Sequence, residues 1–94
     1  MQTQQFKGTA RAIRTNETTG TKNYFYHDTP IVGVFTDGSI MLNSGGWRTM
    51  TTKLAMNQAS AQDKLGFSVY QQKRQWFVTW KGETLPFEDN MILR

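Results

Sequence analysis

The residues best suited to chemistry lie between positions 44 and 53, where a glycine pair, an aromatic ring, two cations and several hydroxyls follow one another. Paired glycines let neighbouring backbone N–H groups point at one anion, and a helix start adds unpaired N–H groups and a positive dipole end. Arg and Thr side chains donate to phosphate oxygens, and tryptophan stacks on bases. The sequence therefore predicts a site for nucleic acid or a phosphate-bearing ligand, made by Ser44, Gly45, Gly46, Trp47, Arg48, Thr49, Thr51, Thr52 and Lys53.

The same residues also have purely structural interpretations. The glycine pair suits a tight turn, and Thr49 or Thr51 suits a helix N-cap. Trp47 suits an anchor in the core instead of a stacking surface. Turns and caps account for the glycines and one threonine, but they leave the run of Arg, Thr and Lys at 48–53 unexplained.

Nothing in the chain indicates a catalytic set or a metal centre. His27 is the only histidine, and Asp28 and Thr29 adjoin it along the chain, where His27 and Asp28 suit the turn before Pro30. There is no Walker loop, nucleophile-elbow motif or pair of spaced carboxylates. With no cysteine and one histidine the usual zinc ligands are lacking. We therefore expect a protein that is not an enzyme and that uses no metal or cofactor.

Length and composition indicate a single globular domain spanning residues 1–94, since 37% of the residues are hydrophobic and 13% aromatic. Eleven Lys and Arg against seven Asp and Glu give a net charge of +4, which suits phosphate-bearing partners and equally suits an ordinary solvated surface. Neither a signal peptide nor an apolar run of membrane-spanning length occurs. We expect a cytoplasmic protein without a membrane partner.

The pattern of apolar residues and turn formers places strands before and after one helix. Strands are predicted at residues 6–13, 23–26, 31–35, 39–42, 67–71 and 75–80, with 84–87 a short edge strand and 91–93 at the core or an edge. The segment 49–62 lacks Gly and Pro and predicts a helix that ends before Gly66. The fold class is α+β, an antiparallel sheet of about five to six strands with one helix packed on it, in the order β-β-β-β-α-β-β.

Two finer features are also predicted. Asp37-Gly38 indicates a two-residue hairpin turn with positive φ at both positions. Helical periodicity places Met50, Leu54, Ala61 and Leu65 on the face toward the sheet, beside Trp47. It places on the opposite face Thr49, Thr52, Lys53, Met56 and Ser60.

Part of the chain also resembles a known group of proteins. The resemblance rests on Tyr26-His27-x-Thr29, Leu42-Asn43-Ser44-Gly45-Gly46-Trp47-Arg48-Thr49-x-Thr51-Thr52-Lys53, Met56-Asn57-Gln58, Gly66 and Val69-Tyr70-Gln71. With these segments, most of residues 24–80 resembles small proteins encoded by tailed bacteriophages. The resemblance implies a setting, a phage accessory protein in the cytoplasm of a bacterial host, and no particular activity. By analogy with other small phage proteins it favours a non-enzymatic effector that binds nucleic acid or a host protein.

The alternative to nucleic-acid binding is inhibition of a host protein, such as a defence factor or a metabolic or replication enzyme. Large rings occur in number, and exposed Tyr and Trp are common hot spots of protein interfaces. The strand at 75–80 alternates so that Trp76, Val78 and Trp80 share an inner face and Phe77 points outward. Salt separates the two functions, because nucleic-acid binding weakens steeply with salt and an apolar interface does not.

Overall fold

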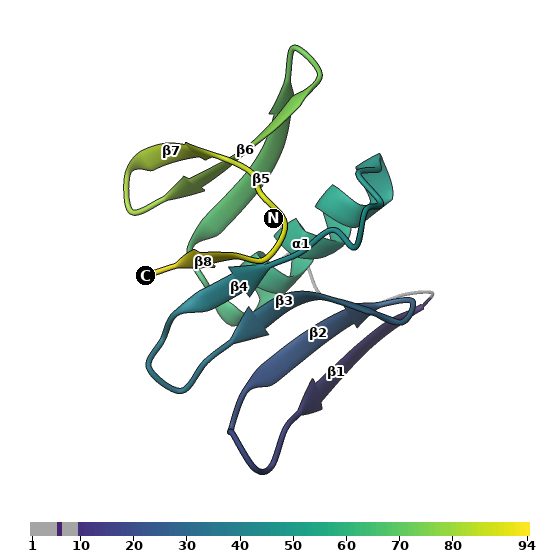
Figure 1. Cartoon of the computed structure of the whole chain (residues 1–94), viewed down its shortest axis with the longest axis vertical. Helices are drawn as coiled ribbons and strands as arrows, with labels where there is room; N and C mark the ends of the chain where they lie inside the picture. Colours follow the sequence, from purple (N-terminus) through teal and green to yellow (C-terminus); the bar gives the residue numbers. More distant parts are fainter. Residues whose placement is uncertain (1–5, 7–9) are drawn as a thin grey trace.

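The computed structural model describes residue 6 and residues 10–94, and within them it confirms the α+β class (Figure 1). Part of the first predicted strand, residues 7–9, lies outside the described residues. In chain order the elements are β1 (Arg11–Thr15), β2 (Lys22–Tyr26), β3 (Thr29–Val34), β4 (Ile40–Leu42), α1 (Met50–Asp63), β5 (Phe67–Gln72), β6 (Gln75–Trp80), β7 (Glu83–Pro86) and β8 (Met91–Leu93).

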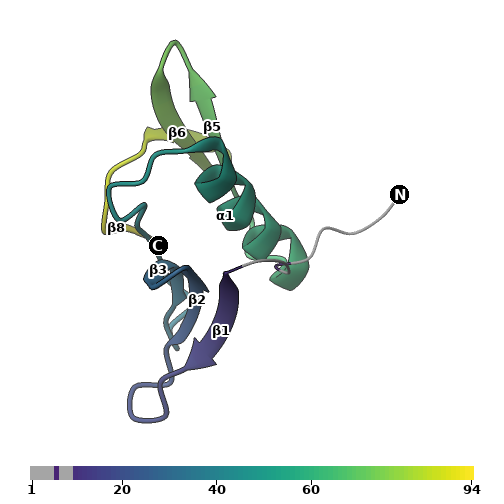
Figure 2. The same cartoon turned by 90° about the vertical axis from the view of Figure 1, so that its right-hand side faces the viewer.

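The strands form two antiparallel sheets, where the sequence predicted one sheet of about five to six strands. One sheet has the order β1-β2-β3-β4-β8 and the other β5-β6-β7, and α1 runs alongside both (Figure 2). β8 leaves its sequence neighbour β7 and pairs with β4. Just before β8, the Asn90 N–H donates to the Leu42 carbonyl at 2.8 Å. A bond between residues so distant in sequence gives no local pattern.

The β3–β4 and β5–β6 hairpins both form where they were predicted, but their turns differ from expectation. Between β3 and β4 the turn spans residues 35–39, and of the Asp37-Gly38 pair only Gly38 has a positive φ, 89°. The Asp37 carboxylate accepts from the Ser39 N–H at 2.9 Å, and this bond stabilises the longer turn. Between β5 and β6 the turn is the two-residue one, with φ of 52° at Lys73 and 66° at Arg74.

The helix forms as predicted, but the predicted face is wrong. Small or polar side chains and one large one, Met56, form the face toward the sheets. Its buried residues are Thr52, Ala55, Met56, Ala59 and Ser60. The large residues assigned to that face are exposed, Met50 by 79% and Leu54 by 43%. Ala61 is exposed and Leu65 half-buried, while Lys53, expected outside, is half-buried.

Polar contacts between α1 and the edge of β5 explain why hydrophobic periodicity gave the wrong face. The Asn57 amide donates to the Val69 carbonyl at 2.9 Å and accepts from the Val69 N–H at 2.8 Å. Ser60 does the same with Phe67, donating at 2.6 Å and accepting at 3.2 Å. The helix thus provides the hydrogen bonds that a neighbouring strand would otherwise make to the edge of β5. This pairing requires Asn and Ser on the inner face instead of large apolar residues.

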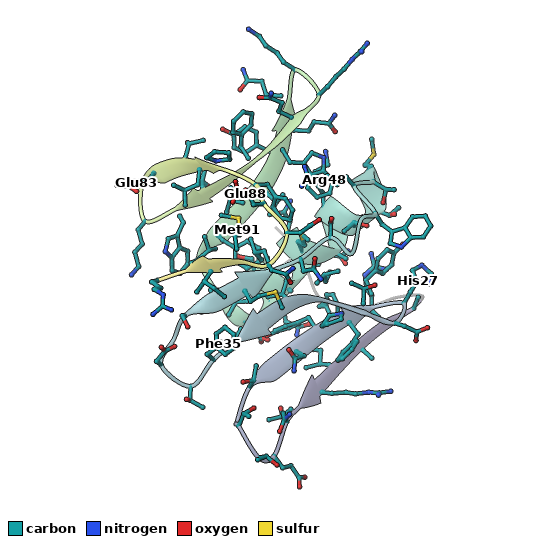
Figure 3. All side chains as sticks on the ribbon, in the orientation of Figure 1. His27, Phe35, Arg48, Glu83, Glu88 and Met91 are labelled. Atoms are coloured by element: carbon teal, nitrogen blue, oxygen red, sulfur yellow. The ribbon has the colours of Figure 1, made fainter. Side chains whose placement is uncertain are left out.

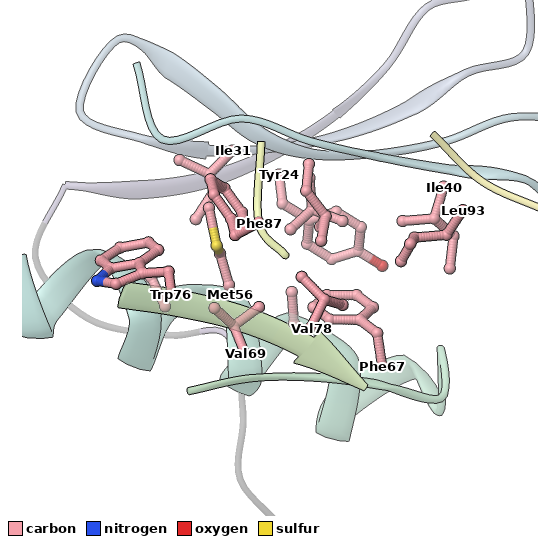
Figure 4. Close-up of a cluster of buried hydrophobic side chains, with 14 of the residues drawn as sticks. Tyr24, Ile31, Ile40, Met56, Phe67, Val69, Trp76, Val78, Phe87 and Leu93 are labelled. Atoms are coloured by element: carbon pink, nitrogen blue, oxygen red, sulfur yellow. The ribbon is translucent and has the colours of Figure 1, made fainter. Parts of the chain in front are cut away.

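The core lies between the two sheets and the helix. Figure 4 shows Tyr24, Ile31 and Ile40 of the larger sheet facing Met56 of α1 and Val78 of β6. The inner face predicted for β6 is correct for Trp76 and Val78, which are buried, whereas Trp80 and Phe77 are both half-buried.

The last turn of α1 is also tied to the larger sheet. The Asp63 carboxylate accepts from the Tyr24 hydroxyl and, at 2.9 Å, from the Lys22 ammonium group. The Tyr24 bond, with a smaller contribution from Lys22, outweighs burial and holds the pKa of Asp63 below its usual value. Burial and the adjacent carboxylate raise the pKa of Tyr24.

Candidate functional site

The glycine pair of the predicted site forms a tight turn with positive φ, 66° at Gly45 and 84° at Gly46. Its N–H groups are used inside the turn, by the Asn43 side-chain oxygen at 3.1 Å and the Ser44 hydroxyl at 3.2 Å. The glycines therefore shape the chain and do not present the open anion nest that the sequence suggested.

Ser44 anchors this turn to the far end of the chain. Its N–H and hydroxyl both donate to one oxygen of Asp89, at 2.8 and 2.6 Å. Burial raises the pKa of Asp89, but the two Ser44 bonds and the nearby Arg48 charge outweigh burial and keep the pKa below its usual value. Buried Ser44 is thus held by protein partners.

Thr49 is the N-cap of α1, as one of the structural interpretations expected. Its hydroxyl accepts from the Thr52 N–H at 3.2 Å and lies 3.1 Å from the Thr51 hydroxyl and 3.0 Å from that of Thr52. The N–H groups of Met50 and Thr51, at the first two helical positions, have no acceptor within the helix.

The two cations of the predicted site, Arg48 and Lys53, both lie over the ring of buried Trp76. The Arg48 guanidinium is 5.2 Å from the Phe87 ring centre and 6.0 Å from that of Trp76, and the Lys53 ammonium is 5.6 Å from the Trp76 ring. Lys53 also donates to the Gln71 side chain at 3.2 Å. Figure 3 shows Arg48 well separated from His27 around the start of α1.

The other side of the junction is a cavity of about 380 Å³. Its lining comes from β2, the β2–β3 turn, β3 and the junction, namely Tyr26, His27, Thr29, Ile31, Ser44, Trp47, Thr49, Thr51 and Thr52. Trp47 is 69% exposed, so the core-anchor interpretation is wrong. The structure therefore divides the predicted site, with Ser44, Trp47 and the threonines at the cavity and the cations outside its lining.

Four lining residues were absent from the predicted site, namely Tyr26, His27, Thr29 and Ile31. The rings of Tyr26 and His27 lie 4.5 Å apart between centres. A Cβ at Gly45 would approach the Thr29 methyl group to 2.7 Å, so the two chain segments are in close contact. The resemblance could have pointed to these residues, because the segments on which it rests include both Tyr26-His27-x-Thr29 and the junction.

Positive charge is concentrated on α1, β5, β6 and their connections. Between positions 38 and 82 the only carboxylate is Asp63, which is bonded to Lys22. The same stretch carries six cations, Arg48, Lys53, Lys64, Lys73, Arg74 and Lys81. This stretch of the chain therefore carries an excess of positive charge.

The comparisons give the family. A family model described as Kyanoviridae Gp96 protein matches residues 1–94. The chain belongs to this family. It is a phage protein, as the resemblance implied. No curated protein and no solved structure matches this Gp96-family chain.

Within residue 6 and residues 10–94, no group of three or more His, Asp or Glu side chains is arranged to hold a metal ion. In that same part of the chain, no helix has the length and apolar character needed to span a membrane.

Proposed function

We propose that this Gp96-family protein is a non-enzymatic phage accessory protein that binds nucleic acid at the junction of residues 44–53. The observation that carries the proposal is the exposed ring of Trp47 at the cavity. Tryptophan is a large apolar surface that proteins normally cover, and a nucleobase offers a flat partner for it.

The charge distribution supports a polyanionic ligand. Arg48 and Lys53 lie next to the cavity-forming segment, and the rest of the basic stretch continues along α1, β5 and β6. Phosphates near the bound base would gain Coulomb attraction from these cations. In the cytoplasm of an infected bacterium, where we expect the protein to act, nucleic acid is the abundant ligand with this chemistry.

The cavity lining supports binding without catalysis. It contains one imidazole, His27, and no carboxylate that could orient it. Its hydroxyl groups and aromatic rings suit recognition of a ligand held by stacking and hydrogen bonds.

The test is a titration of fluorescently labelled single-stranded and duplex oligonucleotides at several salt concentrations. We expect binding that weakens with salt, and a double variant, Arg48→Ala with Lys53→Ala, that lowers the salt slope by somewhat under about one unit per lost phosphate contact. The matched control is Lys73→Ala with Arg74→Ala at the β5–β6 turn. Equal losses in both double variants would show diffuse electrostatics, and no binding to either oligonucleotide would overturn the proposal.

A second function, inhibition of a host protein, is favoured by one observation. Three large apolar side chains are exposed near the helix start, Trp47 just before α1 and Met50 and Leu54 on its first turns, and exposed apolar side chains are common in protein interfaces. Capture of partners from host lysate with and without nuclease separates the functions. Proteins retained after nuclease treatment, and lost with Met50→Ala and Leu54→Ala, would favour inhibition.

A further inference from the structure

We infer that the cavity holds one unstacked nucleobase against Trp47, which makes the ligand a single strand and not a duplex. The inference rests on the proposed function and names its ligand class. Aromatic rings enter the cavity lining from two directions, Tyr26 and His27 from the β2–β3 side and Trp47 from the junction. Ile31, 1% exposed, adds an apolar residue to the lining. This composition suits a flat heteroaromatic ring.

The size of the cavity limits what can enter. Its 380 Å³ falls near the lower end of small-molecule sites, which span roughly 300–1,000 Å³. That volume accommodates one nucleotide but no stack of base pairs. A base in a duplex is covered on both faces by its neighbours, so it reaches an aromatic wall only after leaving the stack, at a cost of a few kcal/mol. A single strand avoids most of this cost.

Some polar side chains of the cavity lining are already hydrogen-bonded within the protein, and others can still bond to a ligand. Ser44 donates to Asp89, and the Thr52 hydroxyl is paired with that of Thr49. Base edges would therefore meet Thr29 and the exposed Thr51, whose hydroxyl lies 3.1 Å from that of Thr49 and retains further hydrogen-bonding capacity. Hydroxyls both donate and accept, so they discriminate little between bases. Affinity should depend weakly on base sequence and strongly on strandedness.

The position of the cations agrees with this arrangement. Arg48 and Lys53 are outside the lining and lie over Trp76, with Lys53 held by Gln71. A base in the cavity leaves its flanking phosphates outside, on the protein surface. The cations there would bind backbone phosphates without contacting the base, which is the usual division between stacking and charge in single-strand binders.

The experiment compares a labelled oligothymidylate with a duplex of equal length, for the wild-type protein and for Trp47→Ala. We expect the single strand to bind at least about tenfold more tightly than the duplex. Trp47→Ala should weaken single-strand binding about 5- to 150-fold, the range given by one lost stacking contact, and change duplex binding little. Trp47→Phe should restore part of the affinity, because it retains a ring.

The matched control is Met50→Ala, which removes another exposed apolar side chain that does not line the cavity. It should leave both affinities unchanged. If single strand and duplex bind equally and Trp47→Ala affects neither, while the Arg48 and Lys53 double variant weakens both, the base cavity is wrong, and nucleic-acid binding at the junction then depends on its cations and not on Trp47. If neither oligonucleotide binds, both proposals fail. Retention of a host protein that depends on Trp47 after nuclease treatment would instead make the cavity a protein contact.

Discussion

Around its last turns, helix α1 is fastened to both sheets by side-chain hydrogen bonds, whereas around its first turns large side chains face solvent. Asn57 and Ser60 pair with backbone groups of β5, and Asp63 pairs with β2. At the other end Trp47 and Met50 are largely exposed beside an open cavity. The same helix thus combines a closed end, held to both sheets by side-chain hydrogen bonds, with an open one.

The two ends separate residues that the fold requires from residues that are free to bind a ligand. At the closed end polar side chains replace a missing strand, so removing them leaves buried backbone groups unpaired. At the open end the apolar side chains have no partner within the described chain that would explain them. Substitutions should therefore affect stability at one end and binding at the other.

The largest effect should come from Asn57→Ala. The change removes both partners of Val69 at the edge of β5, and each unpaired buried backbone group costs about 1–3 kcal/mol. We expect the free energy of unfolding to fall by about 2–4 kcal/mol. Urea denaturation measures it, with Met50→Ala as the exposed control on the same helix, expected within about 0.5 kcal/mol of wild type. Equal losses in the two variants would remove the distinction between the ends.

Gly45→Ala should lower stability although Gly45 lies at the open end, because the space and backbone conformation there require a glycine. Its φ of 66° disfavours a Cβ, and the added atom would lie 2.7 Å from the Thr29 methyl group. We expect a loss of about 1–3 kcal/mol and weaker oligonucleotide binding as the cavity wall moves. Gly46→Ala is the matched control, since it has a similar φ and open space around it. If both variants lose the same stability, contact with Thr29 contributes nothing.

Asp63→Asn should change how stability depends on pH. The folded-state pKa of Asp63 is lowered, so its contribution is complete above the unfolded pKa of about 3.9 and disappears as pH falls through the folded value. We expect Asp63→Asn to cost about 1–2 kcal/mol at neutral pH and to reduce the stability lost between neutral and acidic pH. Thermal unfolding from pH 7 to pH 3 measures this. A wild type and variant with parallel pH profiles would contradict the assignment.

The smallest effect on stability should belong to Trp47→Ala. An exposed side chain that contributes little to the core changes the free energy of unfolding by no more than about 0.5 kcal/mol. Urea denaturation of the variant checks this, and it also shows that any lost binding does not come from unfolding. A loss above about 2 kcal/mol would return Trp47 to the core-anchor role.

Local sequence signals were sufficient for most elements of the fold. Asp37-Gly38 located the β3–β4 hairpin, and the absence of Gly and Pro located α1 to within one residue at each end. These predictions succeed because turn formers and helix breakers act through their own backbone preferences. The division into two sheets and the place of β8 were not predictable from local signals, since they depend on which strands pair across the chain, as β8 does with β4.

The buried face of α1 and the cavity could not be predicted from the sequence in the same way. Periodicity assumes that a helix buries its apolar side, but Asn57 and Ser60 are needed to pair with β5 and bring the small residues inward with them. The junction was identified from its composition, yet its division into a cavity and a cationic side depends on how Trp47 and Arg48 diverge in space. His27 was interpreted as a turn residue, and its φ of 56° agrees with that, although its ring also lines the cavity.

NMR of the indole N–H groups shows whether the exposed Trp47 ring receives a base. Addition of oligothymidylate to ¹⁵N-labelled protein should shift the Trp47 indole signal, identified by its absence in Trp47→Phe. The signal of Trp80, whose Nε1 donates to the Arg94 carbonyl at 3.2 Å, should stay in place. The amide of Thr51, in the cavity lining, should move with Trp47. Shifts confined to the Lys73 and Arg74 amides, with the Trp47 signal unchanged at saturation, would contradict base binding at Trp47.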